Sequence, residues 1–138
     1  MYSRILIPTD GGEKAQRAIE IGLDQASRFE ATVHALYVID ERFVLTEYDF
    51  PVEEAERAGE EALDHVFEVG QEVGVPVERH LRQGIPHDEI LAAIDSYGVD
   101  LVVIGRRSRT GLDRLASLGT VTQRVVRHSP VTVMTVPA

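Results

Sequence analysis

Two segments in the C-terminal part of the chain carry residues suited to holding a phosphate group. The first segment follows a run of four apolar residues and reads Gly105-Arg106-Arg107-Ser108-Arg109. The second is Gly119-Thr120, which comes just before a short segment with apolar residues at helical spacing. Arginine offers charge and paired N–H donors to phosphate oxygens, and glycine lets a ligand approach the backbone closely. The N–H groups at a helix start attract the same anion. We therefore expect an anion site here, in which the Thr120 hydroxyl either donates to a phosphate or caps the helix.

The distribution of charge separates this region from the rest of the chain. The 138 residues carry a formal net charge of −9, but residues 105–129 contain six arginines against the single acid Asp113. A positive island in an acidic chain suits a small anion, although charge alone leaves open a solvated basic helix face. The overall acidity argues against general nucleic-acid binding, which requires a broad basic surface. We expect no nucleic-acid partner.

Other kinds of chemistry have little support in the sequence. The chain has no cysteine, which excludes disulfides and thiolate metal sites. No nucleophile elbow or P-loop motif occurs. The histidines show no spacing typical of a metal site, and His34, within a predicted strand, is interpreted as a packed or hydrogen-bonded side chain. The five histidines are His34, His65, His80, His87 and His128.

The sequence alternates short apolar runs with amphipathic segments, and these elements must position the residues of the expected anion site. Apolar residues at helical spacing predict helices within 15–26, 55–73, 90–98 and 121–126, with a loop at 40–51. The order βαβαβαβαβ predicts a single α/β domain over residues 1–138, with helices on both faces of an open parallel sheet of order 3-2-1-4-5. The predicted strands are Arg4–Ile7, Thr32–Val38, Val77–Leu81, Leu101–Ile104 and Val131–Val136.

A sheet of this kind binds ligands beyond the carboxyl ends of its strands, where the winding direction switches. Three loops meet that description: Pro8 to Gly12, Ile39 to Arg42, and the segment from Gly105 onward. Asp10 lies in the first loop, where it would either face a ligand or cap the following helix. Val38, at the end of the second strand, would either face the ligand or belong to the core.

With these motifs in place, the sequence resembles the universal stress protein (UspA-like) family over its whole length. The resemblance rests on five segments: 5–10 (ILIPTD), 38–40 (VID), 100–105 (DLVVIG), 119–126 (GTVTQRVV) and 129–134 (SPVTVM). Members that bind ATP carry Gly-x-x-Gly, nine residues, and then Gly-Ser or Gly-Thr. This chain matches at Gly105 and Gly119-Thr120, but Ser108 replaces the second glycine and ten residues separate it from Gly119.

The resemblance implies a Rossmann-like, adenine nucleotide α-hydrolase-like fold with ATP or AMP as cofactor. Asp10 is then expected near the ribose or a nucleotide-bound Mg²⁺, the backbone at Val38 near the adenine, and Gly119 with Thr120 at the phosphates. The purely structural roles of these residues remain the alternative. The expected cofactor-binding residues are Pro8, Thr9, Asp10, Val38, Gly105, Arg106, Arg107, Ser108, Arg109, Gly119, Thr120 and Val121.

The expected function is that of a dimeric stress-response regulator that binds an adenine nucleotide and is not an enzyme. A β-rich apolar last strand, Val131 to Val136, would form an exposed sheet edge and pair two copies as a homodimer. Two alternatives remain: a dimeric scaffold of the same family that binds no nucleotide, favoured by Ser108 and the longer loop, and a nucleotide hydrolase-like enzyme. No apolar stretch is long enough to span a membrane and no signal-peptide layout is present, so we expect a cytoplasmic protein.

Overall fold

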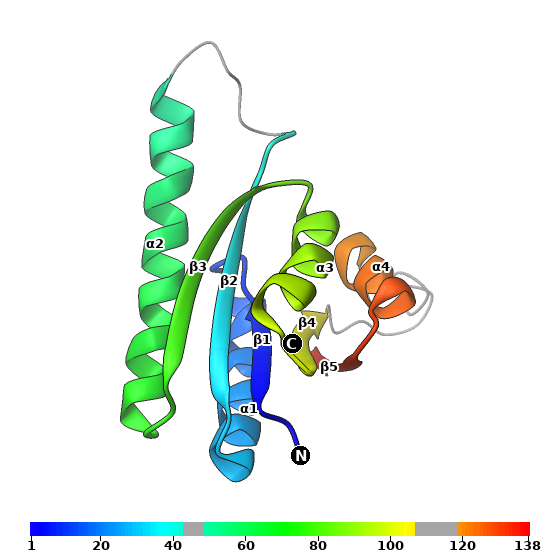
Figure 1. Cartoon of the computed structure of the whole chain (residues 1–138). Helices are drawn as coiled ribbons and strands as arrows, with labels where there is room; N and C mark the ends of the chain where they lie inside the picture. Colours follow the sequence, from blue (N-terminus) through cyan, green and yellow to red (C-terminus); the bar gives the residue numbers. More distant parts are fainter. Residues whose placement is uncertain (43–48, 107–118) are drawn as a thin grey trace.

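The computed structural model describes residues 1–42, 49–106 and 119–138, which form four helices packed on one five-stranded sheet (Figure 1). The helices are α1 (Glu13–Phe29), α2 (Asp49–Glu72), α3 (Pro86–Tyr97) and α4 (Thr120–His128). The strands are β1 (Arg4–Pro8), β2 (Thr32–Asp40), β3 (Val77–Gly84), β4 (Leu101–Arg106) and β5 (Thr132–Pro137). No helix in these described ranges has the length and apolarity that crossing a bilayer requires.

All neighbouring strands in the sheet are parallel, and their order is β3-β2-β1-β4-β5. This confirms the predicted fold class and strand order. The helices α1 and α2 cover one face, while α3 and α4 cover the other (Figure 1). The direction of winding therefore switches between β1 and β4, as the βαβ crossovers require.

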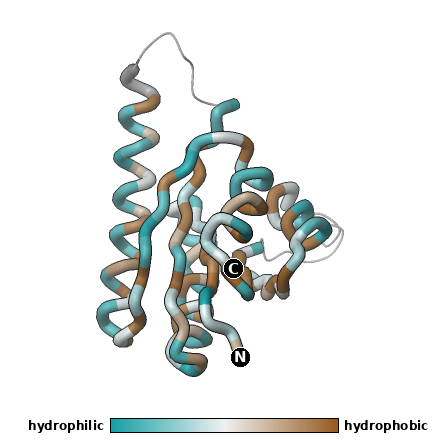
Figure 2. The backbone as a smooth tube through the Cα atoms, viewed as in Figure 1, coloured by the Kyte–Doolittle hydropathy of each residue, from teal (hydrophilic) through white to brown (hydrophobic). Residues whose placement is uncertain are grey.

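The core is divided by the sheet into two layers, which explains why the central strands are continuous apolar runs. Ile5, Ile7 and Val103 point to the α1 and α2 side, whereas Leu6 and Val102 point to the α3 and α4 side. All five are fully buried. The helices turn their apolar residues toward these strands and their hydrophilic residues outward, and α2 is hydrophilic along much of its outer side (Figure 2).

Every predicted strand is present, but each one ends later than its turn residues suggested. Pro8 and Gly105 still lie inside β1 and β4, because backbone pairing with the neighbouring strand continues to Leu36 and Val136. The largest difference is β3, which runs on from Leu81 to Gly84 in full register with β2. The predicted loop at 40–51 is too long at both ends, since Asp40 belongs to β2 and α2 begins at Asp49.

Candidate functional site

A cleft opens beyond the carboxyl ends of β1, β2 and β4, next to the start of α4. Its volume is ≈ 680 Å³, within the range of about 300–1,000 Å³ that is usual for small-molecule sites. Every predicted site residue within the described part of the chain lines it. These residues are Pro8, Thr9, Asp10, Val38, Gly105, Arg106, Gly119, Thr120 and Val121. The remaining three, Arg107, Ser108 and Arg109, lie outside the described residues.

The turn between β1 and α1 is held by its own side chains. Gly11 N–H donates to Thr9 Oγ1 at 3.1 Å, and Gly12 N–H donates to Asp10 Oδ1 at 2.9 Å. Such side chain–backbone bonds two residues apart form a tight turn, and Gly11 follows with φ +79°. The alternative in which Asp10 caps α1 is wrong, because Gly12 is the N-cap and no side chain caps that helix. Asp10 instead shapes the turn and stands exposed at the cleft.

The start of α4 presents its backbone to the cleft. Gly119 is the N-cap, with φ 72° and ψ 162°, and no described side chain caps the helix. The first N–H groups of a helix have no partner within the helix, so this end is open to an anion. Thr120 is the first helical residue and is exposed. The alternative in which Thr120 caps α4 is wrong, because Gly119 is the N-cap, and Thr120 instead lines the cleft.

The sequence reasoning missed Thr122, which fixes α4 to the end of β4. Its buried hydroxyl donates to the Gly105 carbonyl oxygen at 3.0 Å. A side chain at Gly105 would meet α1, because an added Cβ would lie 3.3 Å from the Lys14 carbonyl oxygen. Gly105 thus permits the close approach of α1 as well as lining the cleft. These contacts bring the starts of both helices to the same strand end.

Charges of both signs line the cleft. Lys14 and Arg106 are its described cations, and Asp10 and Asp40 are its described carboxylates. A hydrogen bond from the Arg42 side chain holds the pKa of Asp40 below its usual value, so Asp40 stays ionised. Burial raises the pKa of Tyr37, and the nearby Asp10 carboxylate raises it further.

Sequence reasoning did not single out Lys14, Tyr37 or Asp40. The apolar residues at helical spacing within 15–26 place Lys14 just before the predicted helix. The neighbouring residues in the sequence do not indicate that this side chain lines the cleft. Asp40 belongs to one of the three predicted ligand loops and to the segment 38–40 that carries the family resemblance, and these were the two signals that could have found it. The apolar wall comes mainly from Leu36, Val38, Ile39, Ile90 and Ile104.

The fold and the cleft together define an open, doubly wound α/β protein with a ligand-sized site at the topological switch point. A sequence model of the universal stress protein family matches residues 1–137. The chain belongs to the universal stress protein family, which confirms the resemblance stated above.

The most similar relatives include archaeal members of this family. Universal stress protein MJ0531 of Methanocaldococcus jannaschii is 34% identical, with 99% of this chain and 84% of that protein covered. The solved structure of MJ0577 from the same organism is 32% identical, covers 100% of this chain and 97% of its own, and has a TM-score of 0.79.

More distant solved structures share the fold and contain nucleotides. A universal stress protein family protein from Arabidopsis thaliana with AMP bound is 19% identical, with a TM-score of 0.73 over 98% of this chain and 91% of its own. Two further universal stress proteins were crystallised with cAMP at 22% identity and, from Archaeoglobus fulgidus, with dAMP at 19% identity. At these identities the likeness concerns the fold alone.

Proposed function

We propose that this chain is a stress-response regulator that binds an adenine nucleotide, ATP or AMP, in the cleft beyond β1, β2 and β4. One observation carries the proposal: the nine described residues among those expected from the sequence to contact a nucleotide, drawn from three strand ends and one helix start, line the same cleft. Family membership and the adenine nucleotides in structures of the same fold support it.

The two sides of the cleft suit the two parts of a nucleotide. The apolar side, with Val38 and Ile39 at the end of β2, suits an adenine ring. The uncapped start of α4, together with Lys14 and Arg106, suits phosphates, since helix N-termini and cations both favour anions. Asp10 is the carboxylate that would contact a Mg²⁺ carried by the nucleotide, because Mg²⁺ prefers carboxylate and phosphate oxygens.

Binding rather than catalysis is the proposed role. Among the described residues that line the cleft there is no histidine and no cysteine. Oδ1 of Asp10 is already engaged by the Gly12 N–H group, and Asp40 is held by Arg42. A general base must be within reach of the proton that it removes, and the contacts of Asp10 and Asp40 favour binding over catalysis as the role of this cleft.

The cations of the cleft provide a direct test of the phosphate side. We expect the double variant Lys14→Gln, Arg106→Gln to lose about tenfold or more in ATP affinity, because a hydrogen bond to a charged group is worth about 1.5–3 kcal/mol. Adenosine, which lacks phosphates, should lose little. Titration calorimetry with both ligands measures the difference.

The control for that experiment is Arg17→Gln, Arg28→Gln, which removes the same charge from exposed positions of α1 outside the cleft. This control should bind ATP as the unmodified chain does. Equal losses for ATP and adenosine in the cleft variant would show that Lys14 and Arg106 do not serve the phosphates. An unmodified chain that binds neither ATP nor adenosine would favour the alternative of a dimeric scaffold that binds no nucleotide. The spacing between Ser108 and Gly119, one residue longer than in members that bind ATP, also favours that alternative.

We further propose that two copies pair through β5. This strand lies at one end of the sheet and pairs only with β4 among the described strands. An unpaired strand edge offers a row of N–H and C=O groups to a second chain. Light scattering on the purified protein at micromolar concentration should therefore give twice the mass of one chain. A mass equal to one chain would contradict this assembly.

A further inference from the structure

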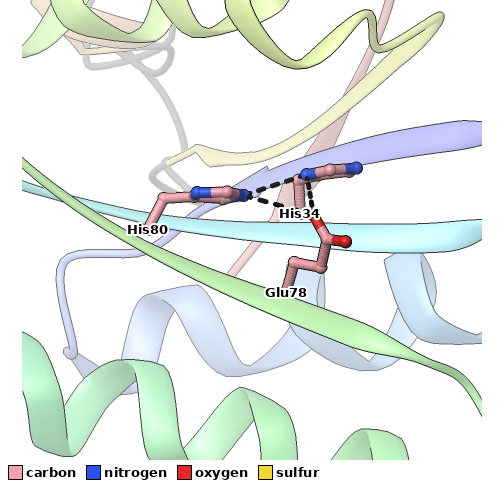
Figure 3. A group of neighbouring side chains, drawn as sticks. All are labelled: His34, Glu78 and His80. Carbon is pink, nitrogen blue, oxygen red and sulfur yellow. Dashed lines mark hydrogen bonds and ion pairs between the residues drawn. The ribbon is translucent and has the colours of Figure 1, made fainter.

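Three side chains on neighbouring strands meet on the sheet face that carries α3, away from the cleft (Figure 3). Glu78 and His80 are two positions apart on β3, and alternate residues of a strand share one face. His34 on β2 lies directly opposite Glu78 in the parallel register, and Leu36 lies opposite His80. The strand pairing therefore brings two imidazoles and one carboxylate together, although 46 positions separate His34 from His80.

The distances between the three groups match the spacing of ligands around one metal ion. His34 Nδ1 lies 2.9 Å from His80 Nε2 and 3.3 Å from Glu78 Oε2, and His80 Nε2 lies 3.9 Å from the same oxygen. Two ligands at about 2.0–2.1 Å from a tetrahedral zinc ion are about 3.4 Å apart. The observed separations fall on both sides of that value. An ion between the three atoms would replace the hydrogen bond between the two rings, and each ring would turn its facing nitrogen toward the ion.

The surroundings hold the imidazoles in place. The Tyr97 ring at the end of α3 stacks on the His80 ring, with 3.8 Å between centroids, and lies parallel to the His34 ring at 5.6 Å. Arg82 donates to the Tyr97 hydroxyl at 3.2 Å and is itself paired with Glu89. Such partners around a ligand fix its orientation and support metal sites. Only Glu78, with 61% of its side chain exposed, faces solvent freely.

We propose that His34, Glu78 and His80 form a binding site for a divalent transition-metal ion, Zn²⁺ in the first place, with a fourth position open to solvent. Two histidines and one carboxylate are an established ligand set for zinc with an open position. Imidazole and carboxylate ligands also select against Mg²⁺, which prefers oxygen alone.

The protonation of the two histidines suits this role. Burial lowers the pKa of His34 and of His80, so both rings are neutral near pH 7, the form that binds a metal ion. In the hydrogen bond between them, one ring nitrogen donates and the other accepts. On metal binding the bridging proton moves to the other nitrogen of its own ring, which leaves both facing nitrogens with a lone pair.

This site is separate from the cleft, because none of its three residues lines that cleft. A bound ion would join the edge strand β3 to β2, next to the end of α3. Its expected consequence is stabilisation of the sheet edge, since any ligand that binds the folded state alone stabilises it.

Zinc titration of the full chain tests the proposal. After removal of metals with a chelator, calorimetry with Zn²⁺ should show one ion per chain, and the melting temperature should rise with added Zn²⁺. Co²⁺ should bind in its place with the visible absorption of a four-coordinate site. We expect about a tenfold or greater loss of Zn²⁺ affinity in Glu78→Gln and in His80→Gln.

The matched control is His128→Gln, which removes an exposed histidine at the end of α4 and should leave Zn²⁺ binding unchanged. Circular dichroism of each variant checks the fold, and Glu78→Gln keeps the side-chain shape at an exposed position. Absence of binding at micromolar Zn²⁺, or binding that survives both Glu78→Gln and His80→Gln, would overturn the proposal.

Discussion

Gly119→Ala is expected to weaken adenine nucleotide binding by about tenfold or more while the chain stays folded. Gly119 has φ 72° and ψ 162°, a combination adopted almost only by glycine and costing another residue about 1–3 kcal/mol. An added Cβ would meet nothing within 4 Å, so the effect comes from the backbone and not from a clash. Relief of this strain would turn the first N–H groups of α4 away from the phosphates. Loss of one such bond is worth about tenfold in affinity.

Gly74→Ala is the matched control for this variant. Gly74 also has φ +72° with open space around an added Cβ, but it follows α2 and does not line the cleft. Both variants should lower the melting temperature by several degrees, because about 1 kcal/mol corresponds to roughly 3–4 °C in a chain of this size. Only Gly119→Ala should weaken ATP or AMP in calorimetric titration. If the two variants bind ATP or AMP with equal affinity, the start of α4 does not contact the nucleotide.

Leu6→Ala should cause a large loss of stability, about 2–5 kcal/mol, or roughly 7–17 °C in melting temperature. Leu6 is fully buried on the central strand β1, where it packs in the core layer beneath α3 and α4. Deletion of its side chain leaves a cavity between rigid elements that cannot close over it. Chemical denaturation with urea measures the change in the free energy of unfolding.

The comparison for that variant is Leu81→Ala, which makes the same chemical change on the edge strand β3. Leu81 keeps 37% of its surface exposed, so less apolar area returns to water and the neighbouring residues can relax. We expect less than half of the loss seen for Leu6→Ala. Similar losses at both positions would contradict the two-layer core described above.

The fold could be predicted from the sequence because its signals are local and agree with one another. The apolar runs around Leu6 and Val102 identify buried parallel strands, and the alternation with helical stripes fixes the topology. Strand ends were less predictable. The strands predicted to end at Ile7 and Ile104 continue to Pro8 and through Gly105, because backbone pairing with a neighbouring strand includes these two residues.

The candidate site was predictable in location but not in local detail. The strand order alone places Asp10, Val38 and Gly105 at one end of the sheet. The side-chain bonds could not be predicted in the same way. Asp10 and Thr120 belong to residue types that commonly cap helices, but here the glycines Gly12 and Gly119 occupy the capping positions.

The histidine cluster shows a different limit. Metal motifs are recognised by short spacing along one element, and His34 is far from His80 in the chain. Their proximity depends on the register between β2 and β3, which pairs His34 with Glu78. A shift of one residue would turn Glu78 and His80 to the other face of the sheet. Only a structure with that register defined brings the three groups together.

The most direct test of nucleotide binding is mass spectrometry of small molecules released from the purified, denatured protein. The proposed function predicts ATP or AMP at close to one per chain, or, if the nucleotide is lost during purification, a melting temperature that rises on addition of Mg-ATP. A purified protein that releases no nucleotide, and whose melting temperature does not change on addition of Mg-ATP, would contradict nucleotide binding. The family membership and the fold would stand, and the cleft beside Gly119 would need another ligand or none.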